Sequence, residues 1–201
     1  MATLNEMSQS TTGRALLAAA LLALPACRKV PPEHGIVITN PLPAAALAIR
    51  DSRGGLFDLA AQKGKPVLLY FGYTHCPDVC PQTLADFARA RRLAGGAAAG
   101  VSLVFVSVDP ERDTPAVAES YARQFDSTFV GLAPSRVQLD TIKNAWGFAV
   151  ERDSMPGMKA DEYGVTHPAG VFFIDRDGKV EFIFAPGTKP PDIATDLRRL
   201  L

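Results

Sequence analysis

Residues 66–81 read Pro-Val-Leu-Leu-Tyr-Phe-Gly-Tyr-Thr-His-Cys-Pro-Asp-Val-Cys-Pro, and this stretch decides the fold. The apolar run Pro66–Tyr70 predicts a buried strand, and the spacing of apolar residues after Cys80 predicts a helix. Asp78 at the N-cap would place Cys80 in the first helical turn. Open α/β sheets carry their chemistry beyond the carboxyl ends of their strands, so the loop with Cys76 and Cys80 is the first candidate site.

On both sides of this stretch, strand and helix patterns alternate. Strands that alternate with helices and end in a hairpin favour an α/β fold, with a central mixed sheet flanked by helices. The order is that of a three-layer, thioredoxin-like domain with an N-terminal β-hairpin extension. The other expected strands are Leu47–Arg50, Leu56–Leu59, Val101–Val108, Phe129–Leu132, Gly170–Ile174 and Val180–Phe184, and the expected helices are Cys80–Ala94, Thr114–Phe125, Ser135–Trp146 and Pro190–Leu201.

The composition limits what the protein can do. Apolar residues make up 47% of the 201 residues and charged residues 21%, which excludes wholesale disorder and a polytopic membrane protein. Lysine and arginine together number 21, as do aspartate and glutamate, so the formal net charge is zero. Without a basic excess, nucleic acid is excluded as a partner.

The N-terminus has the pattern of an export signal. The apolar run 15–26 is shorter than the roughly 20 residues that span a membrane, and its length suits a secretory signal. The run ends in Leu24–Cys27, which resembles a lipobox, so we expect residues 1–26 to be a lipoprotein signal peptide. Lipid on Cys27 would then attach the protein to a membrane on the periplasmic side of the bacterial cell envelope. A plain signal peptide or an uncleaved anchor is the alternative.

Residues 27–45 contain four prolines and are predicted to be a tether, and residues 46–201 are predicted to be the folded, thioredoxin-like domain. If Cys27 carries lipid, Cys76 and Cys80 remain as a closed pair. In an oxidising compartment, such a pair forms a disulfide, a metal site or a redox switch. The helix terminus is expected to lower the pKa of the Cys80 thiol. Thiolates select Cu(I) or zinc; zinc prefers four ligands, whereas copper accepts three.

The expected third ligand is His167, just before the strand Gly170–Ile174. In a thioredoxin-like fold, the residue before this strand faces the cysteine loop, usually beside a cis proline. Pro168 occupies the position of that proline, so we expect His167 beside Cys76 and Cys80. A histidine in a surface loop is the alternative.

Two segments carry a resemblance to a known family. Residues 72–81 resemble the copper-binding loop of the Sco/SenC family, the exported copper chaperones of cytochrome c oxidase assembly. Ser107–Pro115, with the sequence Ser-Val-Asp-Pro-Glu-Arg-Asp-Thr-Pro, is similar to the second signature of that family. The resemblance covers roughly residues 45–201. It implies copper, as Cu(I), Cu(II) or both, bound by Cys76, Cys80 and His167.

The resemblance also implies a function. An exported metallochaperone would deliver copper to the dinuclear copper centre in the copper-bearing subunit of cytochrome c oxidase. Another exported copper chaperone and a thiol reductant are further candidate partners. Ligand exchange breaks no bond of a substrate, so this function needs no catalytic residue.

Two other functions use the same cysteines. Thr166 and Pro168 depart from the Asp-His-Ser or Asp-His-Thr that is commoner in the family, which keeps a redox function open. Cys76 and Cys80 would then be the redox-active pair of a thiol-disulfide oxidoreductase that acts on an apo oxidase subunit or another exported protein. The third function is a binding module stabilised by a structural disulfide.

Several neighbouring side chains have weaker claims to a role. Asp78 and Pro168 could orient the ligand side chains without binding the metal themselves, although Asp78 has a simpler role as a helix cap. Three residues are candidate extra ligands, although each is more simply explained as an ordinary loop residue: His75, Met155 and Met158. The segment Asp109–Pro115 is either a turn and helix start or part of a surface that binds a partner. His34 is interpreted as a tether residue.

Overall fold

The computed structural model describes residues 30–153, 159 and 162–201. The predicted signal peptide over residues 1–26, the lipidation residue Cys27 and the methionines Met155 and Met158 lie outside the described residues. None of the helices in the described part of the chain has both the length and the apolar character needed to cross a bilayer.

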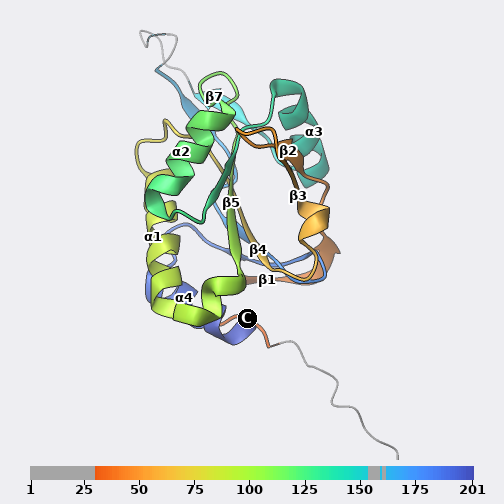
Figure 1. The fold of residues 1–201 in the computed structure, drawn as a ribbon, viewed down its shortest axis with the longest axis vertical. Coiled ribbons are helices and arrows are strands. Elements are labelled where there is room, and N and C mark those ends of the chain that lie inside the picture. Colours follow the sequence, from red (N-terminus) through yellow and green to blue (C-terminus); the bar gives the residue numbers. More distant parts are fainter. Residues whose placement is uncertain (1–29, 154–158, 160–161) are drawn as a thin grey trace, which may run out of the picture.

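A six-stranded mixed sheet forms the centre of the domain, which confirms the predicted fold class (Figure 1). β4, β5 and β6 run parallel, because buried strands joined by helical crossovers pair in this way, whereas β9, β10 and β1 continue the sheet in antiparallel pairs. In spatial order the strands are β1 (Ile36–Pro43), β10 (Lys179–Phe184), β9 (Val171–Ile174), β4 (Val67–Gly72), β5 (Ser102–Ser107) and β6 (Val130–Leu132).

The edge strand β1 corrects the predicted tether. Residues 36–43, expected to be part of a proline-rich linker, pair with β10 instead. Pro41 and Pro43 are compatible with this position because an edge strand has one side without ladder hydrogen bonds, and the register shifts between Val37 and Leu42. The ordered domain therefore begins before residue 46.

Helices cover both faces of the sheet (Figure 1). On one face lie α1 (Val79–Ala94), α2 (Pro115–Phe125) and α4 (Pro190–Leu200), and on the other lies α3 (Arg136–Trp146). The starts of α2 and α3 are capped: Thr114 Oγ1 accepts from Val117 N–H, and Ser135 with Gln138 forms a capping box. The glycine-alanine segment Gly95–Gly100 forms the 3₁₀ helix η2 directly after α1.

Two small hairpins complete the domain. The predicted N-terminal hairpin is confirmed as β2 (Ala48–Arg50) and β3 (Leu56–Asp58), followed by the 3₁₀ helix η1 (Leu59–Gln62). A second hairpin, of β7 (Glu151–Asp153) and β8 (Gly164–Thr166), was not predicted. Its strands have three residues each, and those of β7 are all exposed, so no hydrophobic alternation marks them.

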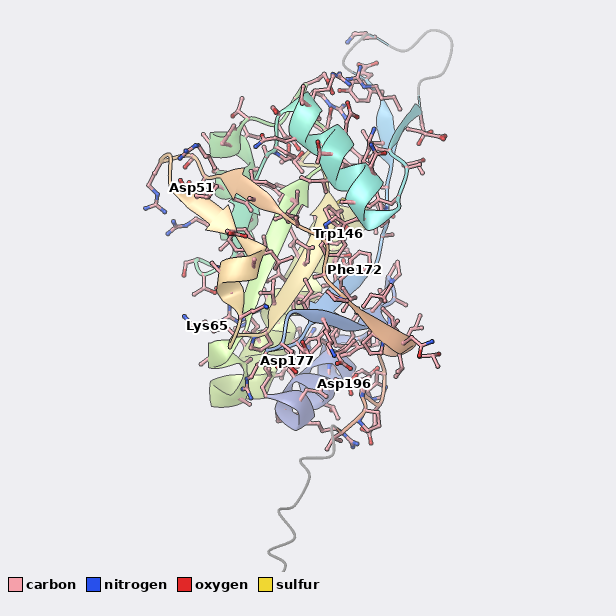
Figure 2. The ribbon with its side chains drawn as sticks, turned by 90° about the vertical axis from the view of Figure 1, so that its right-hand side faces the viewer. Asp51, Lys65, Trp146, Phe172, Asp177 and Asp196 are labelled. Carbon is pink, nitrogen blue, oxygen red and sulfur yellow. The ribbon has the colours of Figure 1, made fainter. Side chains whose placement is uncertain are left out.

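Successive residues of β4 build the two halves of the core. Phe71 is fully buried, and its ring contacts Trp146, Phe148 and Phe172 on the α3 side of the sheet. Trp146 and Phe172 also pack edge to face, and Figure 2 shows them side by side. Tyr70 points to the opposite face, as the twofold alternation of a strand requires. β4 is therefore fixed on both faces, and the loop at its carboxyl end starts from a rigid support.

The chain enters this domain at the α4 end. The carboxylate of Asp196 in α4, which Figure 2 labels, accepts hydrogen bonds from the backbone N–H groups of residues 33–35, at 2.6, 3.0 and 3.0 Å. These residues also fell within the predicted tether. A buried carboxylate with three donors holds this segment to the domain.

Candidate metal centre

The cysteine loop begins where β4 ends, at Gly72. A Cβ at this position would lie 2.9 Å from Phe105 Cε2 and 3.1 Å from Cys80 Sγ. Glycine therefore allows Cys80 to pack directly against the end of the strand. Gly72 O also accepts from Val108 N–H at 2.8 Å, which ties the cysteine loop to the loop after β5.

The sulfur of Cys76 lies at the N-terminus of α1. Cys76 Sγ accepts from the backbone N–H of Cys80 at 3.4 Å. Asp78 occupies the N-cap position, as predicted, but its side chain makes no capping hydrogen bond, so its predicted role as a side-chain cap is wrong. Its role beside the ligands stays a prediction. Both cysteines are free thiols.

The pKa of Cys80 is shifted in the opposite direction to the one predicted. Burial raises the pKa of Cys80 to about 12. Burial also acts to raise the pKa of Cys76, but hydrogen bonds from the backbone N–H groups of Asp78 and Cys80, together with those of the Cys80 and Tyr73 side chains, outweigh it and lower that pKa. The sequence correctly indicated a thiol at a helix terminus, but it assigned the lowered pKa to Cys80, which points into the core.

His167 lies beside Cys80, one of the two cysteines that it was predicted to face. Its Nε2 is 3.6 Å from Cys80 Sγ, and its Nδ1 is 3.0 Å from Pro168 O. A proton on Nδ1 would donate to that carbonyl and leave the Nε2 lone pair facing the sulfur, which is how backbone carbonyls orient metal-ligating histidines. Burial lowers the pKa of His167, although hydrogen bonds with the backbone of Pro168 and Phe71 oppose the shift, so the neutral ring is favoured. Its role as a ligand stays a prediction.

The predicted cis proline is wrong. The peptide bonds within the described residues are all trans, including the one before Pro168. Pro168 instead contributes its carbonyl oxygen, which holds Nδ1 of His167. Pro168 thus contacts His167 with a trans peptide bond, and its role beside the ligands stays a prediction.

The donor set fits copper. Two sulfur atoms and a neutral imidazole are soft and borderline ligands, which suit Cu(I). Among the described residues, no three Cys, His, Asp or Glu side chains already converge as a closed metal cluster. The thiols of Cys76 and Cys80 hydrogen-bond with each other, so the two sulfur atoms are neighbours, and Nε2 of His167 lies beside the second of them.

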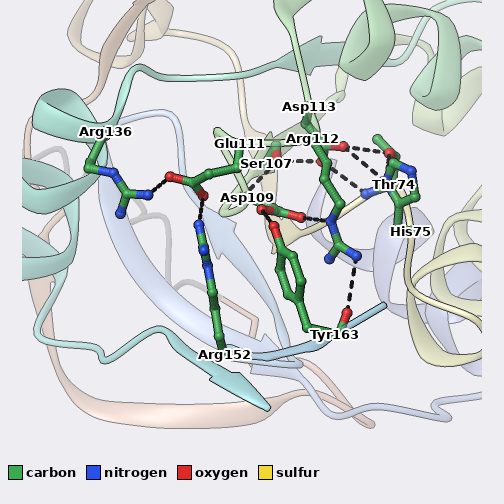
Figure 3. A network of polar contacts seen from close by, with 10 residues as sticks. All are labelled: Thr74, His75, Ser107, Asp109, Glu111, Arg112, Asp113, Arg136, Arg152 and Tyr163. Carbon is green, nitrogen blue, oxygen red and sulfur yellow. Dashed lines mark hydrogen bonds and ion pairs between the residues drawn. The ribbon is translucent and has the colours of Figure 1, made fainter. Parts of the chain in front are cut away.

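The segment Ser107–Pro115 holds the cysteine loop from one side (Figure 3). The buried carboxylate of Asp113 accepts from Thr74 N–H at 2.9 Å, from Thr74 Oγ1 at 2.5 Å and from Ser107 Oγ at 2.5 Å. His75 Nδ1 lies 3.6 Å from Asp113 Oδ1 and 3.1 Å from Thr74 Oγ1. The His75 ring is therefore engaged with this network, and 51% of its side chain remains exposed.

A cation and two tyrosines connect the same segment to His167. The guanidinium carbon of Arg112 lies 3.6 Å from the ring centroid of Tyr163 and 5.6 Å from that of Tyr73. The Tyr73 ring packs edge to face with the His167 ring, with centroids 5.7 Å apart. Sequence reasoning quoted Arg112 within the second signature but gave it no role, and it did not single out Tyr73 or Tyr163.

The remaining histidine lies away from the centre. His34 Nε2 is 3.8 Å from Asp192 Oδ1 of α4, at the end of the sheet where the chain enters. This position agrees with the interpretation that His34 is no ligand of the cysteine site.

Family membership follows from comparison with known proteins. The family model described as SCO1/SenC matches residues 45–201. The chain belongs to the SCO1/SenC family. Among curated members, the mitochondrial SCO1 homolog of Mus musculus is 30% identical over 153 residues, which cover 70% of this chain and 53% of the mouse protein. The chain thus matches about half the length of that relative.

Solved SCO1/SenC structures share the architecture. The apo Sco1 protein of Thermus thermophilus superposes with a TM-score of 0.73 at 35% identity, over 84% of this chain and 96% of that one. ScoI of Bradyrhizobium japonicum, determined with copper bound, gives a TM-score of 0.69 at 35% identity, over 80% of this chain and all of that one.

A more distant structure relates the SCO1/SenC chain to the thioredoxins. The thioredoxin domain of a thiol-disulfide oxidoreductase from Bacteroides vulgatus is 16% identical and gives a TM-score of 0.54, over 79% of this chain and 94% of that domain. At this identity the likeness concerns the fold alone. The predicted thioredoxin-like class is thereby confirmed.

Proposed function

We propose that the protein binds one copper ion through the sulfur atoms of Cys76 and Cys80 and through Nε2 of His167. The observation that carries the proposal is the 3.6 Å approach of His167 Nε2 to Cys80 Sγ, with Nδ1 engaged by a backbone carbonyl. Membership of the SCO1/SenC family, which has a 35% identical relative determined with copper bound, supports the same assignment.

The copper ion is the cargo of a metallochaperone. The protein passes it by ligand exchange to the dinuclear copper centre in the copper-bearing subunit of cytochrome c oxidase, in the cell envelope. Cys76 is partly exposed whereas Cys80 is fully buried, so Cys76 is the sulfur that a partner reaches first. Another exported copper chaperone would load the site, and a thiol reductant would keep both cysteines reduced.

An anaerobic Cu(I) titration against a competing chelator tests the binding site. We expect one copper per domain, loss of tight binding in Cys76→Ser and Cys80→Ser, and binding about 10-fold or more weaker in His167→Ala. His34→Ala is the matched control, because this histidine lies beside α4, and it should bind like the wild type. X-ray absorption should find two sulfur neighbours and one nitrogen. Oxygen and nitrogen neighbours alone would contradict the assignment.

Membrane attachment through Cys27 is a separate proposal, supported by the lipobox-like sequence Leu24–Cys27. Mass spectrometry of protein from a native membrane fraction should find a diacylglyceryl group on an N-terminal Cys27. A mature N-terminus at another residue, without lipid, would refute the attachment and leave the copper site untouched.

A thiol-disulfide oxidoreductase is the second candidate, and one observation favours it. The partly exposed thiol has a lowered pKa and the buried one a raised pKa, an asymmetry that suits a nucleophile and a second, buried cysteine. Thiol exchange does not need His167. Complementation of a deletion strain at low copper distinguishes the two functions: full oxidase activity with His167→Ala, but none with Cys76→Ser, would favour the oxidoreductase.

A further inference from the structure

Arg112 occupies a position between the two segments that carry the proposed ligands. Its guanidinium lies over the ring of Tyr163 and over that of Tyr73, both within the range of cation–π attraction. Tyr73 belongs to the cysteine loop, and Tyr163 directly precedes β8, after which His167 follows. We call the series Tyr163, Arg112 and Tyr73 the aromatic column. It ends on the His167 ring, which Tyr73 contacts edge to face.

Hydrogen bonds fix the orientation of Arg112 in this column (Figure 3). Nη1 donates to Tyr163 O at 3.1 Å, and Nε donates to the carboxylate of Asp109. The other oxygen of Asp109 accepts from Tyr163 OH at 2.7 Å. Only 12% of the Arg112 side chain and 1% of that of Asp109 are exposed, so solvent screens this ion pair weakly.

The β7–β8 hairpin depends on such attachments. An isolated two-stranded hairpin is marginally stable in water, and this one forms a sheet separate from the central one. Val165 is buried and anchors β8 from one side, whereas Arg112 holds the residue before β8 from another. The position of His167 therefore depends on how firmly the start of β8 is held.

We propose that Arg112, acting through the aromatic column, is the positioning residue that keeps His167 beside Cys80 and so sets whether copper gains its third ligand. The inference rests on the copper site proposed above. In this proposal Arg112 acts on His167 through Tyr73 and Tyr163. Without it, Tyr73 and the start of β8 lose their common support, so the imidazole shifts away from Cys80 Sγ even though its contacts with the Tyr70 ring and with the backbone of Phe71 remain, and copper is held by the two sulfurs.

The geometry requires arginine in particular. A planar guanidinium can stack on two rings while it donates in its own plane to a carbonyl and a carboxylate, whereas a lysine ammonium can do neither with the same spacing. Arg112→Lys should therefore keep the charge but behave like Arg112→Met. Tyr163→Phe removes only the hydroxyl that bonds Asp109 and should have a milder effect.

A double-mutant cycle in copper affinity tests the proposal. Arg112→Met should weaken Cu(I) binding about as much as His167→Ala does, and X-ray absorption should lose the nitrogen neighbour but keep both sulfurs. In a His167→Ala background, Arg112→Met should weaken binding no further, because the residue acts through the imidazole. Arg91→Met is the matched control: Arg91 also lies over a ring, that of Phe129 at 5.9 Å, and its loss should leave copper binding unchanged.

The histidine ring gives a readout that needs no metal. In metal-free protein labelled with ¹⁵N-histidine, the His167 nitrogen signals should move toward those of a solvent-exposed ring in Arg112→Met, and by less in Tyr163→Phe. Should Arg112→Met fail to fold, Tyr163→Phe serves alone, with an expected loss of about threefold in copper affinity.

The outcomes separate the two proposals. Equal weakening by Arg112→Met with and without His167 would overturn the positioning role, and so would unchanged ¹⁵N signals; either result leaves the copper site standing. A wild-type protein that binds no copper through sulfur would instead overturn the proposed function. The ¹⁵N signals would still decide whether Arg112 positions His167.

Discussion

The two ends of the sheet each contain a buried carboxylate that holds a distant segment, but the donors differ. At the α4 end, Asp196 accepts three backbone N–H groups from residues 33–35. At the site end, Asp113 accepts one backbone N–H and two hydroxyl groups, from Thr74 and Ser107. Backbone donors are available from almost any sequence, whereas hydroxyl donors depend on the residues present. The α4 end therefore secures the fold, and the site end couples the fold to particular side chains.

The largest expected effect is a difference in reactivity between the two thiols at the site end. Iodoacetamide at pH 7 should alkylate Cys76 about 100-fold faster than Cys80, because the thiolate fraction differs by more than the opposing difference in nucleophilicity. The rate at Cys76 should fall as the pH drops through its lowered pKa, and Cys80, with its raised pKa, should stay protonated at pH 7. Peptide mapping after brief labelling measures the ratio. Equal labelling of both thiols would show that burial does not separate them.

The next effect concerns stability alone. Asp196→Asn replaces one carboxylate oxygen with an amide that cannot accept, so at least one charge-assisted bond to residues 33–35 is lost. We expect a loss of about 2–3 kcal/mol in the free energy of unfolding, measured by urea denaturation. Copper affinity should not change. A matching loss of affinity would mean that the two ends are not independent.

Asp113→Asn is the matched change at the site end. The amide group faces hydroxyl donors of Thr74 and Ser107, so the cysteine loop should lose part of its support. We expect copper binding to weaken about 10-fold, the scale for residues that orient metal ligands, as measured by chelator competition. Wild-type affinity together with reduced stability would make Asp113 equivalent to Asp196 and remove the contrast between the ends.

The smallest effect is expected next to Asp113. Thr114 Oγ1 accepts from Val117 N–H at 3.3 Å and caps α2, but it makes no bond to the cysteine loop in the described structure. Thr114→Ala should lower the free energy of unfolding by about 1 kcal/mol without changing copper affinity. This variant controls for position: a tenfold loss of affinity here would show that any damage near the start of α2 reaches the site.

The sequence sufficed to place Cys80 and His167 together because both positions follow from topology. The first lies after a buried strand and the second before the strand that pairs with it in the sheet. The relative pKa values of the two thiols could not be predicted from the topology, because they depend on which sulfur points into the core. β1 escaped prediction because its prolines are typical of a linker and its edge position leaves most of its residues exposed. The aromatic column could not be predicted either, because it joins three separate loops by contacts that leave no periodic pattern in the sequence.

The hydrogen bonds that Asp196 accepts from residues 33–35 have a mechanical consequence. Tension applied through the preceding chain is borne first by α4 and by the β1–β10 pair, at the end of the sheet opposite the cysteine loop (Figure 1). The central strand β4 is separated from that load by β10 and β9. A pull on the chain before residue 33 is thus expected to turn the domain as one body. The distance between Cys80 Sγ and His167 Nε2 should then stay unchanged.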